Sequence, residues 1–381
     1  MRNVNIVGAG MIAFGRYPDS SYAGLAVPAV LAALAEAGVD AREVTEVFCG
    51  HSFGGPLVGQ RILKDLGVGG IPVTNVENAC SGGASALHLA CRAVSEGKTR
   101  IALVIGVEKL TQFGGGTLPL PSEDWEARNG IVMPAVYAMR AQRFLHERGA
   151  SVEDLAAVAV KARSNGSLNP FAQLQSETTV EAVLASRPIA DPLTLFQCCP
   201  TGDGAAAVVV VSDDVAAALA GRRVAIRASV LHSGSIERGF RDMTFPEISA
   251  ASARDAYAEA GIAAADLDLV ELHDAFTIAE LVYYEVLGLC APGESVAMIR
   301  DGETTLGGRV AVNPSGGLLS KGHPVGASGI AQAAEMYWQL TNQAGRRSVP
   351  DARFGMSHVT GGGISGLDHG ACAIHIYEGV G

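Results

Sequence analysis

The sequence has few aromatic residues, few charges and no long apolar run. Only two of its 381 residues are tryptophan, and charged residues make up 18%. No apolar stretch reaches roughly 18 residues, which argues against a membrane-spanning helix. The opening "MRNVNIVGAG" lacks the charged flank and cleavage site of a signal peptide. We therefore expect a cytoplasmic protein.

Basic runs and paired cysteines are also missing. The formal net charge is −11 and no run of five basic residues occurs, which argues against a nucleic-acid partner. The seven cysteines are odd in number and scattered, without a Cys-x-x-Cys pair. The sequence therefore predicts neither a disulfide framework nor a zinc site, and we expect no metal.

What the sequence does contain is typical of packed α/β layers. It is 48% hydrophobic and has 47 glycines, and its length favours two domains or one duplicated domain. Several Val/Ile/Ala runs lack alternation, as in strands that are covered on both faces. We expect strands at 3–8, 44–50, 73–77, 100–106, 205–211, 224–231, 268–272, 309–313 and 371–377. We expect helices at about 20–37, 82–96, 249–260, 276–287 and 326–341.

Two passages recur in the same order in the two halves. "LAEAGVDAREVTEVFCGHSFG" (34–54) resembles "YAEAGIAAADLDLVELHDAFT" (257–277), and "CSGGASALHLACRAV" (80–94) resembles "HPVGASGIAQAAEMY" (323–337). The repeat offset is 222 to 223 residues in the first pair and 243 in the second. Order and offset together indicate a duplicated unit, in which Cys80 and His323 occupy equivalent positions.

The repeat divides the chain into halves at 1–221 and 222–381. Residues 112–190 have no counterpart in the second half and read as an insertion that covers the site. The segment "VGAGMIAFG" (7–15) imitates a dinucleotide-binding fingerprint, but Gly15 and Pro18 interrupt any following helix. We interpret it as a turn after the first strand.

Cys80 is a candidate nucleophile. It stands at the start of a predicted helix, where free amides and the helix dipole lower a thiol pKa. A buried structural cysteine is the alternative, and it accounts for Cys91 on the same helix. A nucleophile also needs a base and an oxyanion site.

His323 and His273 are the candidate partners. "NPSGGLLSKGHPVGASG" (313–329) places His323 at a glycine-rich junction between a loop and a helix, as a ligand channel would demand. "ELHDAFT" (271–277) ends a buried strand at His273, with Asp274 as an expected N-cap of the next helix. Pseudo-symmetry would bring the two helix starts to one crevice.

Two further segments complete the pattern. "SHVTGGGISG" (357–366) contains three consecutive glycines, whose amides can form an oxyanion hole. "CCPTGDG" (198–204) reads as scaffold, with Cys198 and Cys199 as packing residues.

The motifs "NACSGG", "HDAF", "GHPVGASG" and the final glycine loop together resemble the thiolase superfamily, over nearly the whole chain. The branch with sterol-carrier-protein-type and archaeal thiolases is the most similar, because it has "HD-x-F". The resemblance implies an α/β fold with two duplicated βαβαβ-type halves, layered α/β/α/β/α, plus an inserted loop domain.

The resemblance also implies roles. Cys80 would carry the acyl group as a thioester and His323 would take its proton. His323 and His273 would border the first oxyanion site, and the amides of Cys80 and Gly361 would form the second. Asn313 would support the site, and coenzyme A would reach Cys80 under residues 112–190. In the glycine-rich segment, Gly322 and Gly326 are candidates for substrate contact.

One departure from the family concerns the second cysteine, which moves the substrate α-proton. Most of the family has it where this chain has Val359, and the sterol-carrier-protein type has it where this chain has Ala275. The α-proton then falls to His273, His323, Ser357, His358 or the substrate itself.

Three functions stay open. The leading hypothesis is a thiolase-like acyltransferase of lipid metabolism that uses acyl-CoA or another acyl thioester as substrate and no cofactor. The second is a specialised relative, either a C-acyltransferase on a phenolic or polyketide acceptor or a retro-aldolase on a CoA-linked side chain. The third is a non-catalytic acyl-CoA-binding subunit. The resemblance implies a homodimer or homotetramer and allows a small zinc-ribbon/OB-fold partner.

Overall fold

The computed structural model describes residues 3–219, 221–235, 242–364 and 369–380. The end of the 357–366 segment therefore lies outside the described residues. Within the described part of the chain, no helix is long and apolar enough to cross a membrane.

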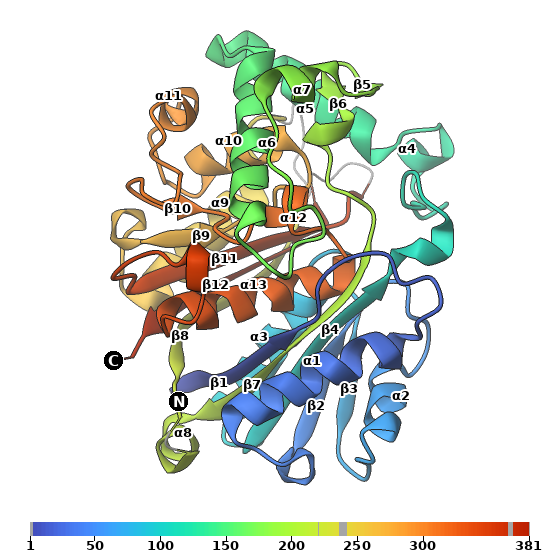
Figure 1. The fold of residues 1–381 in the computed structure, drawn as a ribbon, viewed down its shortest axis with the longest axis vertical. Helices are drawn as coiled ribbons and strands as arrows, with labels where there is room; N and C mark the ends of the chain where they lie inside the picture. Colours follow the sequence, from blue (N-terminus) through green and yellow to red (C-terminus); the bar gives the residue numbers. More distant parts are fainter. Residues whose placement is uncertain (1–2, 220, 236–241, 365–368, 381) are drawn as a thin grey trace.

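Strands and helices alternate along most of the chain (Figure 1). The strands are β1 (Val4–Met11), β2 (Glu46–Gly50), β3 (Val73–Val76), β4 (Ile101–Lys109), β5 (Pro188–Ala190), β6 (Leu193–Thr194), β7 (Asp203–Ser212), β8 (Val224–Ser233), β9 (Leu269–Glu271), β10 (Ala311–Val312), β11 (Phe354–Gly361) and β12 (Ala371–Gly379). The helices are α1 (Tyr22–Ala37), α2 (Val58–Asp65), α3 (Gly82–Ser95), α4 (Trp125–Arg128), α5 (Met133–Arg148), α6 (Val152–Ser167), α7 (Val180–Ala185), α8 (Asp213–Leu219), α9 (Glu247–Ala260), α10 (Thr277–Val286), α11 (Ser295–Arg300), α12 (Gly317–Ser320) and α13 (Val325–Leu340).

The strand order shows the repeat directly. Ten strands are hydrogen-bonded in the order β10-β9-β11-β12-β8-β1-β7-β4-β2-β3. Outward from the central antiparallel contact between β1 and β8, β7, β4, β2 and β3 on one side match β12, β11, β9 and β10 on the other. Both halves therefore build the same five-stranded pattern.

The layers follow from how the helices pack. Helices α3 and α13 contact each other and lie between the two halves, α13 against β4 and β7 and α3 against β8 and β12. Helix α1 packs on β1 and β7, and α9 packs on β8 and β12 (Figure 1). The expected α/β class with a thiolase-like layered arrangement is confirmed.

The segment 112–190 packs over the second half of the chain. Its helix α6 contacts α10, α11 and α12, and α5 contacts α10. The Tyr137 ring stacks on Phe276 with centroids 4.4 Å apart. Figure 1 shows α5, α6 and α7 together at one end of the molecule, above the C-terminal strands.

Two expectations about strands were wrong. The first strand continues through Gly8 and Gly10 to Met11 instead of turning after residue 8. A Cβ at Gly8 would lie 2.3 Å from the Ala33 carbonyl oxygen, and one at Gly10 would lie 2.2 Å from that of Ala29. Glycine is required there because α1 packs directly on the strand. Strand β11 was not among the expected strands.

Candidate active site

Cys80 lies in the turn between β3 and α3, on a strained backbone. Ala79, just before it, has a φ of 48°, a region that non-glycine residues seldom occupy. The amides of Ser81 and Gly82 donate to the carbonyls of Asn78 and Ala79, both at 3.0 Å. The turn is thus fixed by its own backbone, and Cys80 precedes the first residue of α3.

His323 faces Cys80 from the equivalent turn before α13. Its Nε2 lies 3.2 Å from Cys80 Sγ, and its Nδ1 lies 2.8 Å from Ser328 Oγ. The Ser328 hydroxyl donates to the Pro324 carbonyl at 3.1 Å, so its oxygen accepts the proton of His323 Nδ1. This tautomer leaves the lone pair of Nε2 directed at the thiol, as a general base requires.

His273 completes the group. Its ring meets the His323 ring edge-on, with centroids 5.0 Å apart. One ligand atom from each of Cys80, His273 and His323 lies within 4.8 Å of the others, a sulfur and two nitrogens that a zinc ion could also use. Among the described residues, His273 Nδ1 is buried without a hydrogen-bond partner. The structure thus brings the three candidate residues together.

Burial keeps the thiol and its base neutral. It raises the pKa of Cys80 to about 12, against the opposing effect of the Gly362 amide. Burial and the nearby Lys321 lower the pKa of His323 to about 3. The expected lowering of the thiol pKa at a helix start was wrong, because desolvation outweighs the amides here. The negative charge that starts on Cys80 and the positive charge on His323 must therefore form only when substrate is bound.

Asp274 does not cap the helix that follows it. Its carboxylate accepts hydrogen bonds from the amides of Leu318 at 2.7 Å and Leu319 at 3.4 Å, at the start of α12. The expected N-cap role on α10 was therefore wrong, since α12 comes from a segment more than 40 residues away. Asp274 instead ties the His273 segment to the loop that carries His323.

A buried ion pair makes the same connection. Lys321 Nζ lies 3.0 Å from Glu271 Oε2, with both side chains at most 1% exposed. Ser315 donates to the same carboxylate through its hydroxyl at 2.6 Å and its amide at 2.9 Å. The two loops are thus held by paired charges that water cannot screen.

Asn313 holds the backbone just before His273 through its side-chain amide group. Its side-chain carbonyl accepts from the Leu272 amide at 2.9 Å, and its side-chain amide donates to Glu280 at 3.1 Å. Its φ is 52°, so it also turns the chain after β10. These contacts position the residue just before His273.

The glycines differ in what they do. A Cβ at Gly361 would lie 2.2 Å from the Asn78 carbonyl, so the glycine loop rests on the Cys80 turn. The described amides that lower the pKa of Cys80 are its own and that of Gly362, and the sequence analysis did not single out the latter. Gly322 has a φ of 107°, and a Cβ there would lie 2.9 Å from Gln173 Oε1.

Gly326 has a packing role. A Cβ there would lie 2.5 Å from the His51 Cα and 2.7 Å from the Val107 carbonyl oxygen. Close approach of α13 to the strands of the first half therefore accounts for this glycine, and no substrate contact is needed to explain it.

Ser357 and His358 have hydrogen-bond partners outside the Cys80–His323–His273 group. The Ser357 hydroxyl is 3.0 Å from the Tyr377 hydroxyl, and His358 Nε2 is 3.0 Å from Ser249 Oγ. Strand alternation points their side chains to opposite faces of β11. Val359 packs with Ala84 in an apolar cluster against Cys80, so this position offers the site no proton.

Ser328 is the other supporting residue that the sequence analysis missed. The available signal was the repeated Gly-Ala-Ser, which makes Ser328 the counterpart of Ser85. The sequence alone does not say which of the two serines has a histidine beside it.

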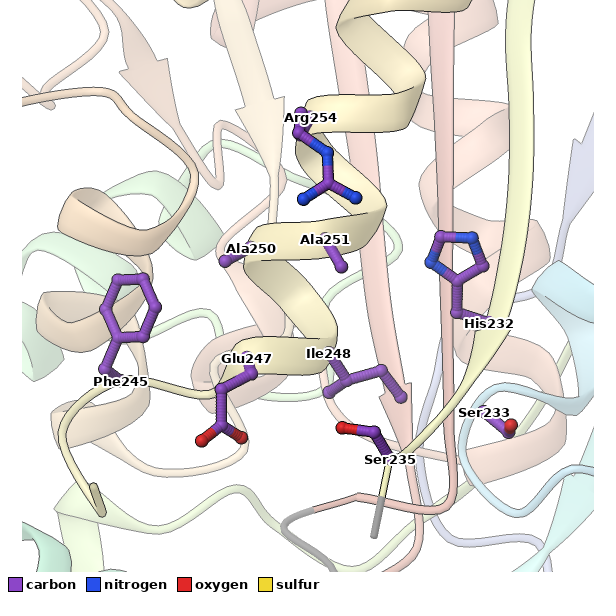
Figure 2. Close-up of a pocket in the computed structure, with 9 residues that line it drawn as sticks. All are labelled: His232, Ser233, Ser235, Phe245, Glu247, Ile248, Ala250, Ala251 and Arg254. Atoms are coloured by element: carbon purple, nitrogen blue, oxygen red, sulfur yellow. The ribbon is translucent and has the colours of Figure 1, made fainter. Parts of the chain in front are cut away.

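A surface hollow of about 440 Å³ lies elsewhere, between the end of β8 and α9 (Figure 2). Its lining residues are His232, Ser233, Ser235, Phe245, Glu247, Ile248, Ala250, Ala251 and Arg254. His232 is engaged there by Ser252 Oγ at 3.2 Å and Asp255 at 3.4 Å. This hollow contains none of the candidate residues.

Comparisons with known proteins agree with the geometry. Residues 4–214 match the thiolase N-terminal domain, and residues 230–369 match a thiolase C-terminal domain-like family. The benzoylsuccinyl-CoA thiolase subunit BbsB of Thauera aromatica is 44% identical over 368 residues, covering 95% of each chain. An acetyl-CoA acetyltransferase of Methanothermobacter thermautotrophicus is 39% identical, covering 99% of this chain and 100% of its own.

A solved structure is also similar. The Ltp2–ChsH2(DUF35) aldolase superposes with a TM-score of 0.85 at 27% identity, covering 98% of this chain and 97% of that chain. The family models, the similar sequences and the fold all agree. The chain belongs to the thiolase family.

Proposed function

We propose that the protein is a thiolase that makes or breaks 3-oxoacyl-CoA esters through an acyl thioester on Cys80. It is an acyltransferase with thiolase-like carbon–carbon chemistry on acyl-CoA, as the named relatives indicate. The observation that carries the assignment of roles is the 3.2 Å contact between Cys80 Sγ and His323 Nε2.

In the first half-reaction, Cys80 attacks the thioester carbonyl of acyl-CoA while its proton passes to His323 Nε2. Both groups are neutral beforehand, so the oxyanion and the imidazolium form together in a buried site. The amides of Cys80 and Gly362, which lower the pKa of the thiol, would donate to the oxyanion. Gly361 stays the alternative donor.

In the second half-reaction, a carbon nucleophile accepts the acyl group. The enolate oxygen of a second acyl-CoA would lie between His323 and His273. Burial, followed by the charges of His323, His358 and His369, holds the pKa of His273 well below its usual value. His273 is therefore a neutral N–H donor, suited to stabilise an enolate without a permanent charge.

The substrate that we propose to test first is benzoylsuccinyl-CoA, since the relative with 44% identity carries that name. Acetoacetyl-CoA is the second substrate to test, since the relative with 39% identity is named an acetyl-CoA acetyltransferase. Either ester plus CoA should be cleaved, with an acyl mass appearing transiently on the peptide that contains Cys80.

The test compares the wild type with Cys80→Ala and Cys80→Ser. Both variants should lose the acyl adduct and at least about 10³-fold in cleavage rate, because the nucleophile is removed. If the wild-type protein stays unmodified at saturating acyl-CoA, the proposed acyl thioester on Cys80 is wrong.

A retro-aldolase is the second candidate, favoured by the similarity to the Ltp2–ChsH2(DUF35) aldolase. Aldol cleavage forms no acyl-enzyme. Activity on a CoA-linked β-hydroxy ketone that survives Cys80→Ser would support this candidate. A C-acyltransferase on a phenolic acceptor would instead show the Cys80 adduct without thiolysis, and a binding subunit would show neither.

We also propose that the chain works in an assembly. The relative BbsB is named as a subunit, and the aldolase neighbour contains a DUF35 protein. Several exposed large apolar side chains belong to the insertion or follow it closely in the sequence, namely Phe113, Trp125, Val132, Met139 and Leu195. Light scattering of the purified chain should give a multiple of the monomer mass, whereas a monomer that gains activity only with an added DUF35 protein would favour the hetero-assembly.

A further inference from the structure

Cys199 lies directly beside the His273 segment. Cys198 and Phe276 form an antiparallel bridge, and the Cys199 amide donates to the Ala275 carbonyl at 2.9 Å. This pairing puts Cys199 opposite Ala275. Residues opposite each other in antiparallel pairs point to the same face, with Cβ atoms about 5 Å apart. The thiol therefore adjoins the methyl group two residues after His273.

Its surroundings connect Cys199 to the nucleophile. Both Cys80 and Cys199 keep partial exposure, while His273 and His323 are only 3% and 5% exposed. Burial and then the charges of Cys198, Cys80 and Asp274 raise the pKa of Cys199 well above its usual value. Cys199 is thus within electrostatic reach of both Cys80 and the His273 segment.

A second thiol is what the proposed reaction otherwise lacks. Ala275 and Val359 cannot move a proton. Ser357 Oγ contacts Tyr377, and His358 Nε2 contacts Ser249. His323 is committed to Cys80 and Ser328, and His273 serves the enolate oxygen as an N–H donor in the proposed reaction. Resting on the proposed function, we infer that Cys199 is the proton-transferring thiol of this site, moving a proton between coenzyme A and the substrate α-carbon.

The protons balance over one cycle of condensation. When Cys80 attacks acyl-CoA, its proton passes to His323, the carbon–sulfur bond to coenzyme A breaks, and the leaving thiolate takes the Cys199 proton. The Cys199 thiolate then removes an α-proton from the second acyl-CoA. The resulting enolate forms the carbon–carbon bond with the acyl carbonyl, and the bond to Cys80 breaks. The Cys80 thiolate recovers its proton from His323, so both thiols are restored.

The properties of Cys199 suit that cycle. A thiol whose pKa is well above the ordinary range is fully protonated at rest, so it has a proton to give. Once deprotonated, it is a stronger base toward a weakly acidic carbon than an ordinary thiolate would be.

The experiment separates acylation from proton transfer at carbon. The first variant is Cys199→Ala, with Cys198→Ala as the matched control because the Cys198 thiol donates to the Thr194 carbonyl at 3.4 Å. Acyl transfer to Cys80 is followed by peptide mass, and exchange of acetyl-CoA α-protons is followed in D₂O. Cys199→Ala should keep Cys80 acylation within about tenfold and lose exchange and cleavage by about 10²–10⁴-fold. Cys198→Ala should change neither.

A compensating variant tests the location. In Cys199→Ala/Ala275→Cys the thiol is returned on the opposite residue, and exchange should recover at least about tenfold. Cys199→Ser keeps the shape but not the acidity, so it should lose exchange as Cys199→Ala does, whereas a packing role would preserve it. Normal α-exchange in Cys199→Ser would overturn the inference. Failure of the proposed function would look different, with no acyl group on wild-type Cys80.

Discussion

The two halves of the chain build the same scaffold and place different chemistry on it. The turn before α3 presents Cys80, and the equivalent turn before α13 presents His323, 3.2 Å away. Duplication thus supplied two facing helix starts, one with a thiol and the other with an imidazole, to which we assign the roles of nucleophile and base. Neither half has a complete site.

The supporting residues diverged as well. The N-terminal half has Cys49 and Asn78 at the positions where the C-terminal half has Glu271 and Lys321. Only the C-terminal pair forms a buried ion pair. The polar network therefore lies on the side of His273 and His323, whereas Cys80 packs against an apolar cluster that includes Val359. The base needs fixed orientation, whereas the thiol needs little more than a fixed turn.

The largest difference should separate the two histidines at equivalent strand ends, His273 and His51. His273→Ala should lower kcat by about 10²–10³-fold, because it removes a donor to the enolate oxygen. His51→Ala, its counterpart in the first half, should change kcat by less than about fivefold. Steady-state cleavage of a 3-oxoacyl-CoA measures both. Equal losses would mean that the two halves share the oxyanion chemistry.

A smaller effect should separate the two equivalent serines. Ser328 orients His323, whereas Ser85 accepts a hydrogen bond from Asn78 at 2.9 Å. Ser328→Ala should slow acylation of Cys80 about tenfold, in line with the loss of one orienting hydrogen bond. Ser85→Ala should leave the acylation rate within about twofold. Rapid-quench measurement of the acyl adduct distinguishes them, and a larger loss in Ser85→Ala would reverse the assignment.

The pH dependence tests whether Cys80 and His323 form a thiolate–imidazolium pair before substrate binds. With the Cys80 pKa raised to about 12 and the His323 pKa lowered to about 3, thiol and imidazole both stay neutral between pH 5 and 9. A raised thiol pKa means that the thiolate fraction still grows at alkaline pH. Alkylation of Cys80 by iodoacetamide should therefore rise about tenfold per pH unit from 6 to 9. A rate that is constant from pH 5 to 8 would reveal a thiolate–imidazolium pair instead.

The repeat was sufficient to predict much of this molecule. It identified equivalent turns at Cys80 and His323, the alternating elements and the insertion, because periodicity and glycine patterns are local properties of the chain. It failed where partners come from distant segments. Asp274 looked like a cap for α10 but binds α12, and the pairing of Cys198–Cys199 with residues 275 and 276 could not be seen in the sequence.

The sequence by itself therefore determined the family, the duplicated scaffold and the candidate nucleophile with its candidate partners. Only the tertiary structure decided their protonation and their supports. Desolvation of Cys80 and His323 depends on every element that encloses them, so no local pattern could predict a neutral pair. The same holds for Ser328, which is distinguished from its counterpart Ser85 only by the histidine beside it.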